Sequence, residues 1–302
     1  MKNHTNTLNK LTFLVLFFVL INYELVGQTN SSPSINQKQE IILKSKINGT
    51  TYHLNVSLPK HYSSKDTTHY PVLYMLDGGL AFPIAHSVRT GLDMFGKLDD
   101  VIIIGIEYEW EESLTPWFTQ RAKDYTPTKD VNFENNQAYL EIFGLAKGSL
   151  LSGEGSIFLN VIRKEIIPLI DKEFKTTSDR GISGHSFGGL FAGYCLFEAT
   201  DLFNKFGINS PSFWWNNKEM FKVEKTFSEH NKSLSVKVFM SVGSMEGNSM
   251  TPVMTAFADS LRSRNYKGLN LTTHIFEDET HMSVVPAMVS RTLGVLYTTK
   301  KE

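Results

Sequence analysis

Cysteine is nearly absent from this chain of 302 residues, because Cys195 is the only one. An internal disulfide is therefore impossible, and no cysteine pair is present to bind a metal ion. The sequence also lacks an H-x-x-x-H pair, a P-loop pattern and the G-x-G-x-x-G fingerprint of dinucleotide-binding proteins. We therefore expect no metal ion and no cofactor.

The chain also lacks an excess of either positive or negative charge. The 30 basic and 31 acidic residues leave a net charge of -1, and the sequence contains no basic stripe or tail. A nucleic-acid partner is therefore not expected. The sequence shows no internal repeat and no low-complexity block, and its length allows one large apolar core to fold without disulfides.

The apolar run near the N-terminus is too short to span a bilayer. Lys2 and Lys10 precede the apolar residues 11–21, after which the chain becomes polar. This order is typical of a secretory signal, and a retained anchor is the alternative. We expect a signal peptide over residues 1–28, with an approximate boundary, and a disordered linker over residues 29–38. The expected location is secreted or periplasmic, without stable membrane insertion.

Strand-like and helical patterns alternate over residues 39–300, which we interpret as a single domain. Two alternating stretches flank the turn sequence NGT and predict a hairpin, and the apolar runs YPVLYM and VIIIGI predict strands buried on both faces. A helix over 156–174, a short strand ending at Ser183 and a helix through Glu198 follow. Further strands are expected at KFGINS, VKVFMSVG and LNLTTHIF, with helices near 216–230, 252–264 and 284–297. The pattern predicts an α/β fold with a mostly parallel sheet, helices on both faces and an antiparallel N-terminal hairpin.

A long irregular stretch rich in aromatic residues covers residues 109–155. Long aromatic loops inside a compact domain tend to bind ligands or to cover a site, so we expect a lid-like insertion here. Within it, Arg121 and Asp124 of QRAKDYTPT either line the site or form an ion pair that fixes the loop, and the ion pair is the favoured interpretation.

The stretch GISGHSFGG contains the pattern G-x-S-x-G, with Ser186 at its centre. It follows an expected strand and precedes an expected helix, which is the context of a nucleophile elbow. The flanking positions require glycine because a Cβ there would collide with neighbouring backbone. Ser186 is therefore the candidate nucleophile, and a serine in an ordinary glycine-rich turn is the alternative. We interpret His185 as structural.

A serine hydroxyl becomes a good nucleophile only with a base and a carboxylate that orients the base. In the hydrolase fold these groups follow in the chain order serine, acid, histidine. His281 lies in the loop after the last expected strand and is the candidate base. Glu246 lies in the loop after VKVFMSVG and is the candidate acid, ahead of Asp259 and Asp278. The alternatives are a surface histidine and a solvated loop glutamate.

The oxyanion formed in acyl transfer needs two backbone N–H donors. Phe187, directly after the candidate nucleophile, is expected to supply one. The loop in LDGGLAF is expected to supply the other, with Gly79 as the favoured donor and Leu80 as the alternative. Gly78 and Gly79 can also be interpreted as residues of a simple tight turn.

Three tryptophans are candidate substrate-binding residues. Trp117 lies in the lid-like stretch, and Trp214 and Trp215 lie in the segment SPSFWW. One of the two adjacent tryptophans is equally well explained by packing in the core. The expected partner is a small-molecule ester.

Several segments resemble the enterochelin-esterase-like branch of the α/β-hydrolases, often called the putative esterase family. The resemblance covers residues 41–296 and rests, in chain order, on YPVLYMLDGG, QRAKDYTPT, SGEGSIFLNVIRKEIIPLI, DRGISGHSFGGLFA, SPSFWW and THMSVVP. It implies an α/β-hydrolase fold, a triad of Ser186, Glu246 and His281, and a backbone oxyanion hole. No arginine cluster that suits a catecholate ligand is found in the sequence.

The expected function is that of an exported serine carboxylesterase, which works through an acyl-enzyme and acts on siderophore-type, aromatic or other acyl esters. An acyltransferase with the same triad and an inactive hydrolase-fold binding module are the alternatives. The sequence does not indicate the oligomeric state.

Overall fold

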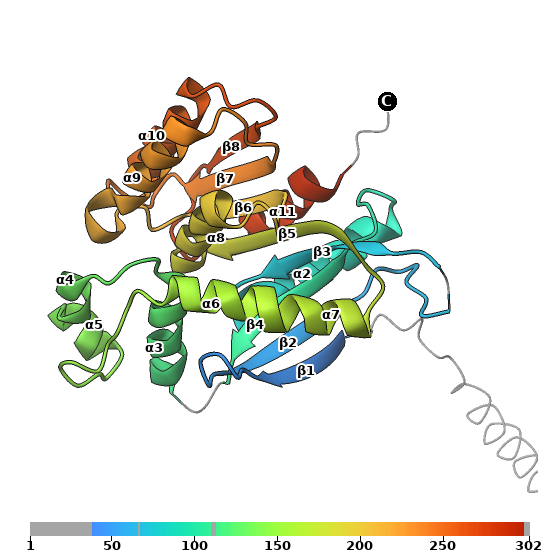
Figure 1. The fold of residues 1–302 in the computed structure, drawn as a ribbon, viewed down its shortest axis with the longest axis horizontal. Helices are drawn as coiled ribbons and strands as arrows, with labels where there is room; N and C mark the ends of the chain where they lie inside the picture. The colour runs from blue at the N-terminus through green and yellow to red at the C-terminus, as the bar shows by residue number, and fades with distance from the viewer. Residues whose placement is uncertain (1–37, 66, 110–112, 299–302) are drawn as a thin grey trace, which may run out of the picture. The chain divides into compact units, whose positions relative to one another are not determined.

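One sheet of eight strands organises the part of the chain that the computed structural model describes, residues 38–65, 67–109 and 113–298 (Figure 1). The strand order is β1-β2-β4-β3-β5-β6-β7-β8. The strands are β1 (Lys38–Lys44), β2 (Thr51–Ser57), β3 (Tyr70–Met75), β4 (Ile102–Tyr108), β5 (Thr176–His185), β6 (Lys205–Asn209), β7 (Lys237–Gly243) and β8 (Asn270–Phe276).

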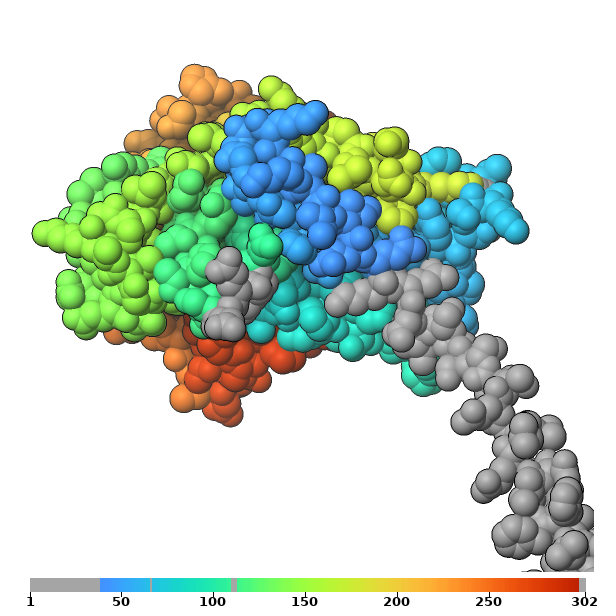
Figure 2. Space-filling model, turned by 90° about the horizontal axis from the view of Figure 1, so that it is seen from below, coloured from blue at the N-terminus to red at the C-terminus, as the bar shows by residue number. Residues whose placement is uncertain are grey.

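The sheet is parallel except at the N-terminal hairpin. β1 pairs antiparallel with β2, and β2 pairs antiparallel with β4, whereas every pair from β4 to β8 is parallel. All residues of β4 are buried, as expected for a parallel strand covered on both faces. Figure 2 shows the hairpin, in blue, on the surface. The predicted α/β fold with an antiparallel N-terminal hairpin is confirmed.

Helices cover both faces of the sheet and build two apolar cores. α2 and α11 pack on one face, with Phe82 and Leu293 in the core between them and the strands. The remaining core holds residues of α3, α6, α8, α9 and α10 on the opposite face. The helices are α2 (Gly78–Met94), α3 (Leu114–Tyr125), α4 (Val131–Glu134), α5 (Gln137–Ile142), α6 (Gly155–Val161), the π-helical turn η1 (Ile162–Ile166), α7 (Ile167–Glu173), α8 (Phe187–Glu198), α9 (Trp215–His230), α10 (Thr251–Ser263) and α11 (Val285–Tyr297).

The described part of residues 109–155 is not the irregular stretch that the sequence suggests, because it includes the helices α3, α4 and α5. Ser113, Asp130 and Asn136 cap these helices by accepting backbone N–H hydrogen bonds. α4 and α5 have only 4 and 6 residues, too few to show a periodic apolar pattern. Aromatic residues join these helices: Phe133 of α4 contacts Tyr139 of α5, and the ring of Phe118 in α3 stacks on that of Phe143, directly after α5, with centroids 3.6 Å apart.

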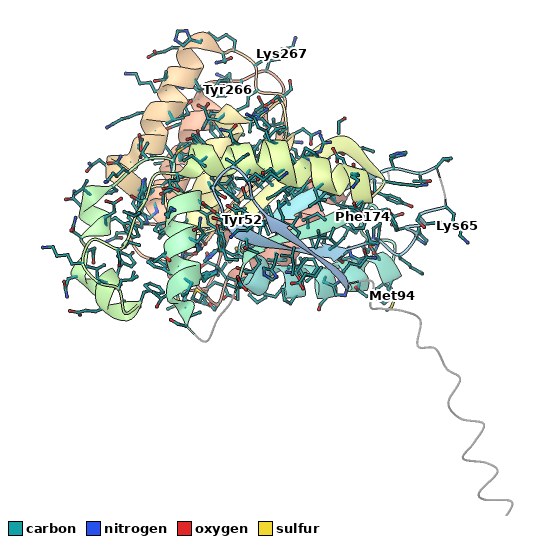
Figure 3. The ribbon with its side chains drawn as sticks, turned by 60° about the horizontal axis from the view of Figure 1, so that its bottom comes forward. Tyr52, Lys65, Met94, Phe174, Tyr266 and Lys267 are labelled. Atoms are coloured by element: carbon teal, nitrogen blue, oxygen red, sulfur yellow. The ribbon has the colours of Figure 1, made fainter. Side chains whose placement is uncertain are left out.

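Helix α2 is a second difference from the sequence-based expectation, which places a loop at LDGGLAF. The helix contains Pro83 and begins with two glycines, all poor helix formers. Burial of its apolar face, including Phe82, stabilises it despite this composition. The carboxyl end of α2, marked by Met94, lies at the end of the molecule away from α4 and α5 (Figure 3).

Two predicted segments lie outside the described residues. They are the signal peptide over residues 1–28 and the linker from residue 29 to residue 37. In the part that is described, no helix is both long and apolar enough to cross a membrane.

Candidate active site

Ser186 stands at the sharp turn between β5 and α8. Its backbone has φ 61° and ψ -117°, a conformation that residues with a side chain rarely adopt. A Cβ at Gly184 would lie 2.4 Å from the backbone of Gly188, so only glycine fits there. The Ser186 N–H donates to the carbonyl of Asn209 at 3.1 Å. This strained strand-to-helix turn is the geometry that a nucleophile elbow requires.

Glu246 and His281 are in direct contact. His281 Nδ1 and Glu246 Oε2 are 2.6 Å apart, and the glutamate side chain is fully buried while the histidine side chain is 37% exposed. Glu246 Oε1 accepts hydrogen bonds from Ser210 Oγ at 2.5 Å and from the Gly243 N–H at 2.7 Å. With an ionised carboxylate at Nδ1, the proton of a neutral imidazole resides on Nδ1, and Nε2 is left as the acceptor.

The hydrogen bonds to Glu246 outweigh the effect of its burial. Burial by itself raises the pKa of this carboxyl, but the hydrogen bonds from His281, Ser210 and Gly243 hold the pKa below its ordinary value. Glu246 is therefore a carboxylate at neutral pH.

His185 connects this pair to the elbow. Its ring centroid is 4.3 Å from that of His281, and Ser186 is the next residue in the chain. Burial lowers the pKa of His185 well below its ordinary value, and His281 and Arg121 lower it further. The three candidate triad residues are thus gathered in one region, with a neutral histidine beside the candidate base.

Asp259 and Asp278, the two alternative candidates for the acid, are both exposed and have different partners from Glu246. Asp259 is exposed on α10, and its carboxylate pairs with Arg262 Nη1 at 2.8 Å. Asp278 is exposed in the loop after β8, where its backbone N–H donates to Ser244 Oγ at 2.9 Å. Of the three carboxylates, Glu246 is the one that contacts His281.

The two candidate oxyanion donors both lie at helix N-termini. Phe187 is the first residue of α8 and Gly79 is the second residue of α2, positions at which backbone N–H groups carry partial positive charge. The Gly79 N–H donates to the carboxylate of Glu107. The N–H of Leu80, the alternative donor, donates to the Asp77 carbonyl at 3.0 Å.

A buried ion pair links the start of α2 to the elbow. Arg121 donates from Nε to Asp77 Oδ1 at 2.6 Å and from Nη2 to Asp77 Oδ2 at 2.9 Å. Nη2 also donates to the His185 carbonyl at 3.0 Å. The expected ion pair between Arg121 and Asp124 is therefore wrong, because Asp124 accepts hydrogen bonds from Tyr52 and Gln120 instead.

Sequence reasoning missed Asp77 as the partner of Arg121, and Ser210 as a partner of Glu246. Asp77 and Ser210 have positive φ values of 53° and 40°, as Ser186 does. The three residues follow the carboxyl ends of β3, β6 and β5, where sites of open α/β sheets gather. Neither contact has a sequence signal, since each joins residues far apart in the chain.

The candidate tryptophans differ in exposure. Trp215 is 1% exposed, and its Nε1–H donates to the Thr128 carbonyl at 3.1 Å, so it is a core residue. Trp214 is half-buried, with its ring centroid 6.2 Å from that of Phe187. Trp117 is also half-buried. The guanidinium carbon of Arg121 lies over its ring, 5.3 Å from the ring centroid.

Comparison with known proteins identifies the family. The model of the family described as "Putative esterase" matches residues 45–142 and 153–281. The chain belongs to the putative esterase family. As a member of the putative esterase family it is a carboxylic ester hydrolase, which confirms the predicted family and enzyme class.

Siderophore esterases are among the proteins that this chain resembles. The chain is 26% identical over 279 residues to the ferri-bacillibactin esterase of Bacillus subtilis, covering 88% of this chain and 92% of that protein. It is 28% identical over 208 residues to the siderophore triacetylfusarinine C esterase of Aspergillus fumigatus, covering 66% and 65%. The crystal structure of the BES protein from Bacillus cereus superposes with a TM-score of 0.73 at 28% identity, covering 87% of this chain and 96% of that one.

Proposed function

We propose that this esterase uses Ser186 as its nucleophile, His281 as its general base and Glu246 as the carboxylate that orients the base. The contact of 2.6 Å between His281 and Glu246 is the observation that carries the proposal. It is supported by the ring contact of His281 with His185, the residue before the strained serine.

In the proposed reaction, Ser186 Oγ attacks the ester carbonyl carbon while His281 Nε2 takes the hydroxyl proton. The tetrahedral intermediate collapses, the bond to the alcohol oxygen breaks, and His281 returns the proton to the leaving alcohol. Water then attacks the acyl-enzyme, again through His281, and releases the carboxylic acid. Glu246 remains ionised and stabilises the imidazolium in both half-reactions.

For the substrate we propose siderophore-type, aromatic or other acyl esters. The names of the two siderophore esterases above support the first class. The surroundings of the site support an uncharged ester, because Leu80, Met245 and Met282 are 39%, 62% and 59% exposed and each is adjacent in sequence to a candidate site residue. Arg121 is buried in its ion pair with Asp77 and is not available to an anionic iron complex.

An acyltransferase would form the same acyl-enzyme and pass the acyl group to an alcohol instead of water. Product analysis with and without added alcohol acceptors distinguishes the two reactions. We also propose that the chain is exported, on the basis of the signal-like order of residues 1–28.

The test of this function is Ser186→Ala, assayed with a panel of neutral and siderophore esters. We expect loss of nearly all turnover with an unchanged melting temperature, since only the modest rate from binding and oxyanion stabilisation remains when a triad member is removed. Labelling by a serine-directed phosphonate should be lost in the same variant. A folded Ser186→Ala protein with near-full turnover would assign the nucleophile elsewhere, and a wild-type protein that resists labelling would favour a binding module.

A further inference from the structure

Glu107 is a buried acidic residue beside the predicted oxyanion hole. It lies in β4 and is only 3% exposed. One carboxylate oxygen, Oε2, accepts the N–H of Gly79, and the other, Oε1, accepts the N–H of Tyr108 at 2.7 Å. The group that the sequence assigns as an oxyanion donor is thus bonded to an anion that belongs to the protein.

The fold holds this carboxylate in place. β3 and β4 are parallel, with Met75 opposite Gly105, so Glu107 emerges next to the residues that lead from β3 into α2. A Cβ on Gly78 would lie 2.9 Å from the backbone of Gly105, which shows how closely the first turn of α2 approaches β4. An anion is stabilised at this position by the partial positive charge of the helix N-terminus.

We propose that Glu107 occupies the Gly79 donor in the resting enzyme and limits the rate of the chemical step. The proposal rests on the function proposed above, in which Ser186 forms a tetrahedral intermediate that carries a negative charge on oxygen. This oxyanion and the carboxylate require the same N–H, and two negative charges within hydrogen-bonding range of one donor repel each other. The Glu107 carboxylate must therefore leave Gly79 before the intermediate can use both donors.

The test is Glu107→Gln, which removes the charge but keeps an amide oxygen that can accept the Tyr108 N–H. Removal of a single oxyanion donor typically costs about 10²–10³ in kcat, so partial relief of the competition should raise kcat by about tenfold. KM for a neutral ester should stay within about twofold, because the effect acts on the transition state. The rate of Ser186 phosphonylation should rise in parallel with kcat. Glu109→Gln is the matched control, since Glu109 is exposed two residues further along the chain, and it should leave both rates unchanged.

A second variant keeps the proposal testable if Glu107→Gln does not fold. Glu107→Asp keeps the charge but withdraws the carboxylate by one methylene from Gly79, and it should also raise both rates. A folded Glu107→Gln or Glu107→Asp protein with unchanged or lower kcat would overturn the proposal and assign Glu107 to support of the α2 turn. Absence of phosphonate labelling in the wild type would instead overturn the proposed function.

Discussion

Replacement of Glu246 by glutamine tests the site most directly, because the structure determines how the amide must lie. Glu246 Oε1 accepts two hydrogen bonds, from Ser210 and the Gly243 N–H, so the amide oxygen takes this position. The amide nitrogen then lies where Oε2 is now, 2.6 Å from His281 Nδ1. Since an amide nitrogen only donates, it would make Nδ1 the acceptor and leave the imidazole proton on Nε2.

A histidine with its proton on Nε2 cannot accept the proton of Ser186. The corresponding exchange of aspartate for asparagine in a serine protease lowers kcat by about 10⁴. We therefore expect Glu246→Gln to lower kcat by about 10³–10⁴, which corresponds to about 4–5 kcal/mol of activation free energy. The retained hydrogen bonds from Ser210 and Gly243 should preserve the fold.

The assay is steady-state hydrolysis of a chromogenic ester, with a melting curve for each protein. Asp278→Asn is the matched control, because Asp278 is an exposed acid in the same loop as His281, and its turnover should stay within about twofold of wild type. If folded Glu246→Gln kept more than about a tenth of wild-type kcat, or if Asp278→Asn were the slower variant, Glu246 would not be the orienting acid.

Three further predictions concern the surroundings of the site. Trp117→Leu should change the ratio of kcat/KM between small and bulky aromatic esters, whereas Phe143→Leu, which loses the stacking on Phe118, should lower the melting temperature without changing that ratio. Arg121→Met should cost about 3–5 kcal/mol of stability in denaturant melts, because it leaves a buried carboxylate unpaired, whereas Arg163→Met breaks an exposed pair and should cost under about 1 kcal/mol. Burial raises the pKa of Asp124 to about 7, so the folded chain binds this proton more tightly than the unfolded chain. The contribution of Asp124 to stability should therefore fall as the pH rises from about 4 to 7, by up to about 1.4 kcal/mol per pH unit. His185, whose pKa is lowered, contributes a slope of opposite sign in both proteins, so the slope due to Asp124 is measured as the difference between wild type and Asp124→Asn. The first prediction is contradicted if Trp117→Leu leaves the ratio of kcat/KM unchanged. The second is contradicted if the two arginine variants lose the same stability, and the third if wild type and Asp124→Asn have equal pH slopes of stability.

The sequence by itself determined the architecture, because buried parallel strands and their covering helices leave long, regular apolar patterns. The run YPVLYM is β3, the run VIIIGI contains the first part of β4, and the hairpin around NGT is β1 and β2. G-x-S-x-G placed Ser186 at a strand-to-helix turn, since the requirement for glycine is local and is visible in the chain itself.

Tertiary structure alone decided the polar contacts around the site. Nothing in the sequence pairs Arg121 with Asp77 instead of Asp124, or directs Glu107 to the Gly79 N–H. The sequence pattern also does not predict helix α2, because its glycines and Pro83 disfavour a helix. The helix is stable because its apolar face is buried against the sheet. These features arise where side chains distant in sequence meet at the carboxyl ends of the strands. A contact of this kind depends on the register of the strands and the direction of each side chain, and neither leaves a periodic trace in the sequence.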